Sequence, residues 1–185
     1  MKVGSTHRYA ATPDVVFAMM TTPAVLTEKY TALGHRDLRM LEHTDHLGEV
    51  SLRSQRSVPM EVPGFAKRLL APMNTVEQRD HWCAPDATNV RTGTWEVVAK
   101  GVPVSAGGTL RMAPGPGGTT IVEINGEVKC SLPLLGGKLA SSVAGDVQRT
   151  LQAEEAFNDG YLAARKKPRT RAKKSPAQRA PRGAT

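Results

Sequence analysis

One long amphipathic helix near the end of the chain constrains the fold more than any other feature. Its apolar side chains recur at intervals of four residues, which places them along one side of a helix predicted over residues 134–165. These side chains are Leu139, Val143, Val147 and Leu151. A helix of about 30 residues is some 45 Å long. In a chain of 185 residues we expect so long an apolar stripe to lie across a sheet.

The N-terminal part predicts a strand followed by two short helices. Residues 2–10 alternate weakly between apolar and polar side chains, which favours a strand. Two Thr-Pro pairs follow, at residues 12–13 and 22–23, and each places a capping threonine before a proline that suits the first helical position. Gly34 is expected to end the second helix.

The sequence between these helices and the long one has the pattern of β-strands separated by turns. The predicted strands cover residues 36–45, 49–58, 74–83, 89–100, 109–112 and 119–130. The glycines at residues 107–108 and 115–118 are assigned to turns between strands. The regular spacing favours an antiparallel sheet over alternating βαβ units. We therefore predict an α+β fold, in which a curved antiparallel sheet of about six or seven strands packs against the long C-terminal helix.

The positive charge of the chain is concentrated at its end. Nine of the 25 basic residues and none of the acidic ones lie from Arg165 onward, so residues 1–164 carry 16 basic and 17 acidic residues. Residues 166–185 contain three prolines and only alanine among apolar types, which predicts a disordered basic tail. The tail is open to three interpretations: non-specific contact with nucleic acid, contact with an anionic membrane, or an extension without a partner.

Other chemical signals are weak. Cys83 and Cys130 are interpreted as reduced thiols, because two cysteines make no disulfide framework. His43, Asp45 and His46 fall at a predicted hairpin turn and lack a third fixed partner, so we predict no metal site and no cofactor. The absence of a secretory signal pattern and of a long apolar run favours a cytoplasmic location.

Several segments resemble a known superfamily. The first corner of the chain, residues 9–17, together with the order of elements resembles the START-like superfamily, also called SRPBCC, which has the helix-grip fold. Within it, four further segments resemble an actinobacterial family of unknown function, of the DUF2505 type. They are residues 57–63, 77–82, 101–103 with 108–110, and 132–139. The resemblance implies a START-like domain over residues 1–165 and transfers no catalytic residue.

The helix-grip fold implies a cavity between the curved sheet and the closing helix, and alternation along the strands indicates which side chains face it. The candidates are Val76, Trp82, Trp95, Val97, Leu110, Met112, Val122, Ile124, Val128, Leu139, Val143, Val147 and Leu151. The alternative is that these side chains pack into a solid core. Arg56 and Asp80 share the parity of inward neighbours and could orient a polar ligand group, but the sequence favours a position at the solvent-exposed rim.

Three functions remain open from the sequence. The leading hypothesis is non-enzymatic binding, carriage or sensing of a small hydrophobic ligand, such as a lipid or a polyketide-like compound. The first alternative, a cyclase or dehydratase acting on a hydrophobic substrate, also occurs in the superfamily that the chain resembles. It requires acid–base groups inside the cavity, for which Arg56 and Asp80 are the candidates. The second alternative is an interaction protein that uses the basic tail. The sequence does not indicate the oligomeric state.

Overall fold

Seven strands and three helices form the computed structural model, which describes residues 1–68 and 70–166. The strands are β1 (Lys2–Tyr9), β2 (Arg36–His46), β3 (Glu49–Pro59), β4 (Met73–Trp82), β5 (Arg91–Ala99), β6 (Val104–Gly115) and β7 (Thr119–Cys130). The α-helices are α1 (Pro13–Thr21), α2 (Pro23–Ala32) and α3 (Gly136–Lys166). Two short 3-10 helices, Gly64–Ala66 and Pro116–Gly118, lie in the connections after β3 and β6.

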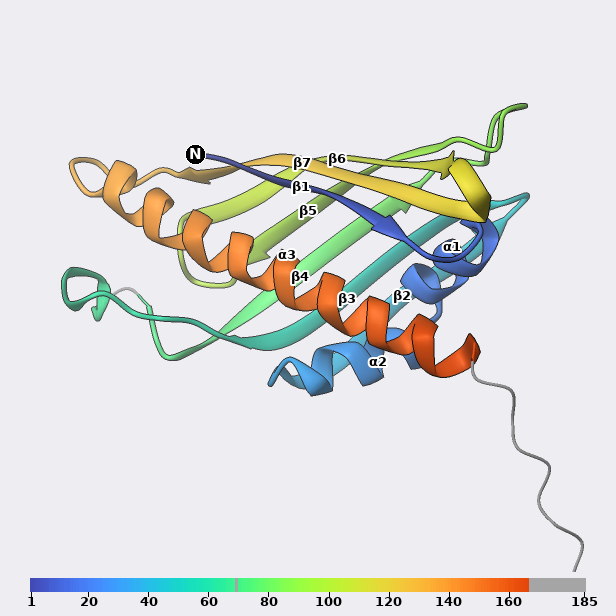
Figure 1. Cartoon of the computed structure of the whole chain (residues 1–185). Helices are drawn as coiled ribbons and strands as arrows, with labels where there is room; N and C mark the ends of the chain where they lie inside the picture. The colour runs from blue at the N-terminus through green and yellow to red at the C-terminus, as the bar shows by residue number, and fades with distance from the viewer. Residues whose placement is uncertain (69, 167–185) are drawn as a thin grey trace, which may run out of the picture.

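The strands form one antiparallel sheet in the order β1-β7-β6-β5-β4-β3-β2. The sheet curves around α3, which crosses its concave side, while α1 and α2 lie near the end of α3 (Figure 1). The side chain of Gln148 in α3 accepts a bond from the Gly4 N–H at 3.4 Å and donates one to the Gly4 carbonyl at 3.0 Å. The backbone of edge strand β1 is thus partly covered by the helix. This arrangement confirms the predicted α+β helix-grip fold.

The predicted starts of the first two helices are confirmed, although neither threonine side chain makes a capping hydrogen bond. α1 and α2 begin at Pro13 and Pro23, each after a threonine in extended conformation. Gly34 follows α2 with a φ of 78°, a left-handed conformation that glycine adopts without steric cost. The turn lets the N–H of His35 donate to the carbonyl of Tyr30 at 2.9 Å. A local sequence signal therefore fixes His35 next to Tyr30.

The prediction for β6 was wrong. The strand runs over Val104–Gly115 instead of residues 109–112, and the glycines at 107–108 lie inside it rather than in a turn. A Cβ built on Gly108 would lie 1.9 Å from the carbonyl oxygen of Asn125, so this position has no room for a side chain. Glycine is used here for close approach within a sheet, which the sequence pattern does not separate from a turn.

Two sequence-based expectations concern the ends and surroundings of the fold. The basic tail predicted over residues 166–185 lies outside the described residues, except for Lys166 at the end of α3. Among the helices of the described ranges, none combines the length and the hydropathy that a bilayer crossing requires.

Replacing Gly126 with alanine tests the close packing at the centre of the sheet. A Cβ at this position would lie 2.5 Å from Cζ2 of Trp95 and 2.7 Å from the carbonyl oxygen of Gly107. We expect Gly126→Ala to lower the free energy of unfolding by about 1–3 kcal/mol and to shift the tryptophan emission, because the indole must move. Chemical denaturation followed by fluorescence measures both effects.

Gly160→Ala is the matched control for that substitution. Gly160 lies within α3, and a Cβ there would meet nothing within 4 Å. Alanine at this helical position should leave stability unchanged or raise it by about 0.5–1 kcal/mol. Equal effects of the two substitutions would contradict the packing described at Gly126.

Candidate functional site

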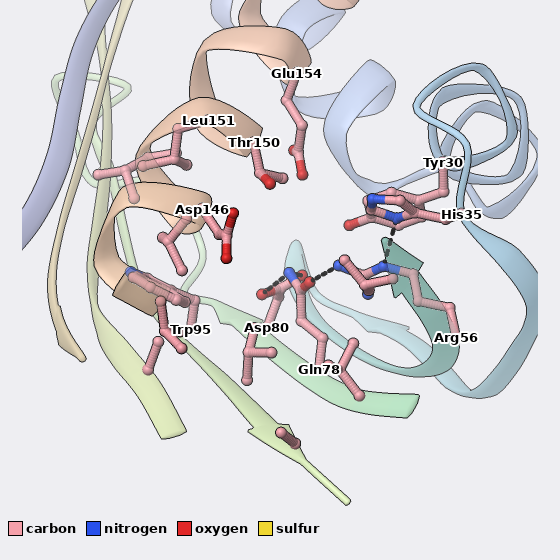
Figure 2. A pocket seen from close by; sticks show the side chains of 18 of the residues that line it. Tyr30, His35, Arg56, Gln78, Asp80, Trp95, Asp146, Thr150, Leu151 and Glu154 are labelled. Carbon is pink, nitrogen blue, oxygen red and sulfur yellow. Dashed lines mark hydrogen bonds between the residues drawn. The ribbon is translucent and has the colours of Figure 1, made fainter. Parts of the chain in front are cut away.

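A cavity lies between the concave face of the sheet and α3 (Figure 2). The centres of water-sized molecules can occupy about 170 Å³ of it. One water molecule needs only about 10–15 Å³ by this measure, so the interior is open rather than packed solid. Among the predicted cavity residues, those that line it are Val76, Trp82, Trp95, Val97, Leu110, Ile124, Val143, Val147 and Leu151, together with Arg56 and Asp80.

Four of the predicted cavity residues lie outside the lining. Met112 and Val122 are register partners near the turn between β6 and β7, and both side chains are buried in the core. Val128 near the end of β7 and Leu139 in the first part of α3 are buried toward the opposite end. Alternation identifies the face of the sheet on which a side chain lies. It does not show whether that side chain lies at a packed end of the curved sheet or beside the open cavity, which depends on the tertiary structure.

A row of register partners crosses the sheet and contributes Asp80 and Trp95 to the cavity lining. Asp80, Trp95, Gly108 and Gly126 face one another on consecutive strands from β4 to β7. Gly126 leaves room for the large Trp95 indole, whose Nε1–H donates to the carbonyl of Asn125 at 3.2 Å. The row therefore places a wide aromatic surface directly beside a carboxyl group.

Arg56 on β3 is buried at the polar end of the cavity, with 4% of its surface exposed. The rim position favoured by the sequence is therefore wrong for this residue. Its Nε donates to Nδ1 of His35 at 3.1 Å, Nη1 to the Ser54 hydroxyl at 3.4 Å, and Nη2 to Oε1 of Gln78 at 2.6 Å. The guanidinium carbon also lies 3.9 Å from the ring centroid of Tyr30. These contacts fix the guanidinium in one orientation.

Burial, assisted by the nearby Arg56 charge, lowers the pKa of His35 to about 4. Its Nδ1 is free of a proton in the bond from Arg56, and its ring stacks on Tyr30 with the centroids 5.3 Å apart. The imidazole is therefore a neutral acceptor at neutral pH and adds no positive charge beside the guanidinium.

Asp80 on β4 also lies inside the cavity and not at the rim. Nε2 of Gln78 is 2.9 Å from both of its carboxyl oxygens, so the Gln78 amide bridges Asp80 and Arg56 (Figure 2). Burial raises the pKa of Asp80 to about 6, against the opposing effects of the Gln78 bond and of the Arg56 charge. Its neighbour His81 bonds Ser51 at 3.1 Å and is absent from the lining, as expected for adjacent residues of a strand.

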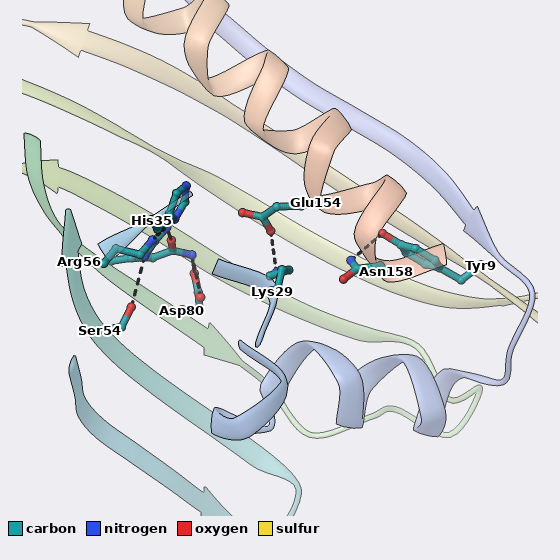
Figure 3. Close-up of polar contacts among 9 residues, drawn as sticks. Tyr9, Lys29, His35, Ser54, Arg56, Asp80, Glu154 and Asn158 are labelled. Atoms are coloured by element: carbon teal, nitrogen blue, oxygen red, sulfur yellow. Dashed lines mark hydrogen bonds and ion pairs between the residues drawn. The ribbon is translucent and has the colours of Figure 1, made fainter. Parts of the chain in front are cut away.

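A buried ion pair closes the polar end. Nζ of Lys29 lies 2.7 Å from a carboxyl oxygen of Glu154, which joins α2 to α3 (Figure 3). Burial disfavours both charges, but their attraction outweighs it, so the pKa of Lys29 is raised and that of Glu154 is lowered. Both groups are thus charged at neutral pH.

Sequence reasoning missed several polar residues of the lining. Gln78 could have been found, because it shares the parity of Val76 and Asp80 on the same strand. Glu154 could also have been found, since it lies one helical turn beyond Leu151. Three others are Lys29, Tyr30 and His35, whose position depends on how the end of α2 packs beneath α3, and no local pattern reports that packing.

The described residues contain no group of three His, Cys, Asp or Glu side chains placed to hold a metal ion. His43 and His46 lie on the exposed strand β2, away from the cavity lining.

Comparisons with known proteins agree with this architecture. Residues 5–162 match a family model described as "Protein of unknown function (DUF2505)". No curated protein matches the chain. Among solved structures, the protein TTHA0849 from Thermus thermophilus is 14% identical with a TM-score of 0.63, covering 90% of this chain and 100% of its own.

Two further structures are similar. The lipid transfer and protein localization domain of human StarD13 is 13% identical with a TM-score of 0.55, covering 84% of this chain and 73% of its own. Norcoclaurine synthase from Thalictrum flavum is 13% identical with a TM-score of 0.53, covering 88% of this chain and 86% of its own. At these identities the likeness establishes the START-like fold and nothing finer.

The cost of ionising Asp80 inside the cavity predicts a pH-dependent effect of Asp80→Asn. The folded-state pKa of about 6 exceeds the ordinary value of 3.8, so wild-type stability falls as the pH rises through this window. The asparagine variant lacks this loss. Relative to wild type it should gain about 2.5 kcal/mol between about pH 4 and about pH 8, since one pKa unit is worth about 1.36 kcal/mol and the unfolded carboxyl group is already about half ionised at pH 4.

Denaturation of both proteins at the two pH values measures the difference. Asp45→Asn on exposed β2 serves as the control, because this carboxyl group lies outside the cavity lining. The acid sensitivity that comes from His35 is shared by wild type and Asp80→Asn and cancels in the comparison. A constant difference for Asp80→Asn would contradict the buried position of its carboxyl group.

The Lys29–Glu154 pair predicts a non-additive pair of substitutions. Lys29→Met leaves the Glu154 carboxylate buried without its partner, which should cost about 3–5 kcal/mol of stability. Changing both residues to methionine removes both charges and should recover most of that loss. Thermal or chemical denaturation of the single and double variants checks this, and a double variant as unstable as the single one would argue against the pair.

Proposed function

This chain belongs to the DUF2505 family, and we propose that it binds a small hydrophobic ligand in the cavity between the sheet and α3, as a carrier or a sensor. The observation that carries the proposal is the open space of about 170 Å³, which is lined mainly by aliphatic side chains and two tryptophans. A mostly apolar pocket with a few converging polar groups is typical of small-molecule sites. The lipid transfer domain of StarD13 has the same fold, which is consistent with the proposal.

The lining accounts for both affinity and orientation. Apolar side chains such as Ile124, Val147 and Leu151 gain about 25 cal/mol for each Å² that a ligand removes from water. The fixed Arg56, Gln78 and Asp80 groups at one end give the ligand a polar contact and hence a direction. An elongated molecule with one polar end and one apolar end fits this arrangement.

An enzymatic function of the cyclase or dehydratase type is a second candidate, because Asp80 lies inside the cavity with a pKa near neutrality. In that case Asp80 exchanges a proton with the substrate while Arg56 stabilises a developing negative charge on an oxygen atom. Mass spectrometry of compounds recovered after incubation separates the two functions. Unchanged compounds favour a carrier, whereas conversion that is lost in Asp80→Asn favours an enzyme.

Filling the cavity with one large side chain tests the proposed binding. Val97 faces the cavity, while its neighbour Val98 on β5 is 40% exposed on the other face. We expect Val97→Trp to weaken binding of the neutral fluorescent probe N-phenyl-naphthylamine at least about tenfold, because the indole occupies the ligand's space. Fluorescence titration measures the affinity.

Val98→Trp is the matched control for that experiment. It adds the same side chain to the same strand but leaves the cavity open, so probe binding should remain within about twofold of wild type. Circular dichroism verifies that both variants are folded. Equal loss of binding in the two variants, or the absence of probe binding to the wild-type protein, would refute the cavity as the binding site.

A further inference from the structure

We propose that the cavity recognises an amphipathic monocarboxylic acid, whose carboxylate binds Arg56 and whose apolar body lies along Trp95. This inference rests on the proposed function and names the chemical class of its ligand. It rests on the hydrogen bonds of the buried Arg56 guanidinium and on the partners of the other charged groups that line the cavity.

Arg56 is buried without a direct anionic partner in the described part of the chain. Its three protein bonds reach the neutral groups of His35, Ser54 and Gln78, and no carboxylate lies within ion-pair distance of it among residues 1–68 and 70–166. A guanidinium has five N–H donors, and these bonds use three of them. Because Arg56 lines the cavity, we assign its remaining N–H donors to the polar end of the cavity. A buried charge in this state is strongly stabilised by an anion that brings its own negative charge.

The other charged groups of the lining already have partners. Lys29 is paired with Glu154 at 2.7 Å. Asp146 on α3 lies 2.5 Å from Nη2 of Arg149, and burial raises its pKa in spite of this neighbour. Asp80 receives the Gln78 amide on both oxygens. Arg56 is therefore the group at which a ligand charge can be compensated.

The surrounding carboxyl groups select a single negative charge. Asp80, Asp146 and Glu154 all line the cavity, so a doubly charged phosphate would meet strong repulsion. A carboxylate adds only one charge, and the raised pKa of Asp80 allows that residue to take up a proton and donate a hydrogen bond to it. An amine would instead lie next to the positive charges of Arg56 and Lys29.

The apolar body of the ligand has a defined place. Trp95 is the register partner of Asp80, so the indole begins where the polar end stops. Beyond it the lining continues with Leu110 and Ile124, themselves register partners on β6 and β7, under Val147 of α3. Both an alkyl chain and a flat aromatic group can lie on this surface.

Direct titration of the wild-type protein with matched compounds tests the inference. Decanoate, decanol and decylamine share one chain and differ only in the polar group, while naphthoate carries the carboxylate on an aromatic body. Isothermal titration calorimetry at neutral pH should show decanoate binding at least about tenfold more tightly than decanol, the effect expected of one charge-assisted contact. The ratio of the affinities for decanoate and naphthoate shows whether the site prefers a carboxylate on an aliphatic or on an aromatic body.

Substitutions assign the preference to one residue. Arg56→Gln should reduce the preference for decanoate over decanol to about twofold or less. Arg53→Gln is the matched control on the same strand, because Arg53 bonds Glu77 at 2.7 Å and is absent from the cavity lining. It should retain the full preference. Arg56→Lys keeps the charge and should retain part of it, which guards against a folding defect of the glutamine variant.

Each outcome separates this inference from the proposed function. Equal binding of decanoate and decanol by the wild-type protein overturns carboxylate recognition and leaves hydrophobic binding standing. Preferential binding of decylamine overturns it in favour of an Asp80-centred site. If neither these compounds nor the neutral probe binds, the proposed function itself fails.

Discussion

The shape of the sheet is the constraint on which the rest of the structure depends. Seven antiparallel strands curve around one helix, and the side chains of that helix do not fill the concave space. The two ends are closed by packed residues, such as Met112 with Val122 and, at the other end, Leu139. The open volume is left in the middle, where Gly126 leaves room for the Trp95 indole. The open cavity is thus a consequence of the fold rather than an addition to it.

Burying the charged groups at the polar end of the cavity costs more free energy of folding than burying apolar side chains there would. Burying Lys29 with Glu154 and fixing Arg56 among neutral partners both oppose folding unless the charges are compensated. The polar end of the cavity draws on three elements, since β3 supplies Arg56, α2 supplies Lys29 and α3 supplies Glu154. We interpret the polar end as a recognition site held by the fold, because no carboxylate of the described residues lies within ion-pair distance of the buried Arg56.

Much of the architecture could be predicted from the sequence because it depends on local signals. The Thr-Pro starts, Gly34 and the four-residue apolar spacing of α3 each report a backbone preference that holds in the folded protein. Alternation along the strands also predicted which side chains face inward, and Val97 and Ile124 are two of those that line the cavity. These features require no knowledge of distant contacts.

Features that depend on tertiary packing could not be predicted in the same way. The glycines of β6 have the sequence pattern of a turn, although Gly108 leaves room for the backbone of Asn125 on the neighbouring strand β7. Arg56 was expected at the rim, since a buried guanidinium needs partners, and those partners come from His35 and Gln78 on other elements. Alternation placed Met112 on the correct face but not at the packed end. The composition of the polar end therefore became visible only in three dimensions.

The most direct test of the account is a methyl NMR titration with decanol, which probes the cavity without relying on any particular charge. The account predicts shifts concentrated on the methyl groups of Val97, Ile124, Val147 and Leu151, with Val98 on the outer face unchanged. No shifts at saturating decanol, or shifts of equal size on Val97 and Val98, would contradict the claim that the space between the sheet and α3 is a binding site.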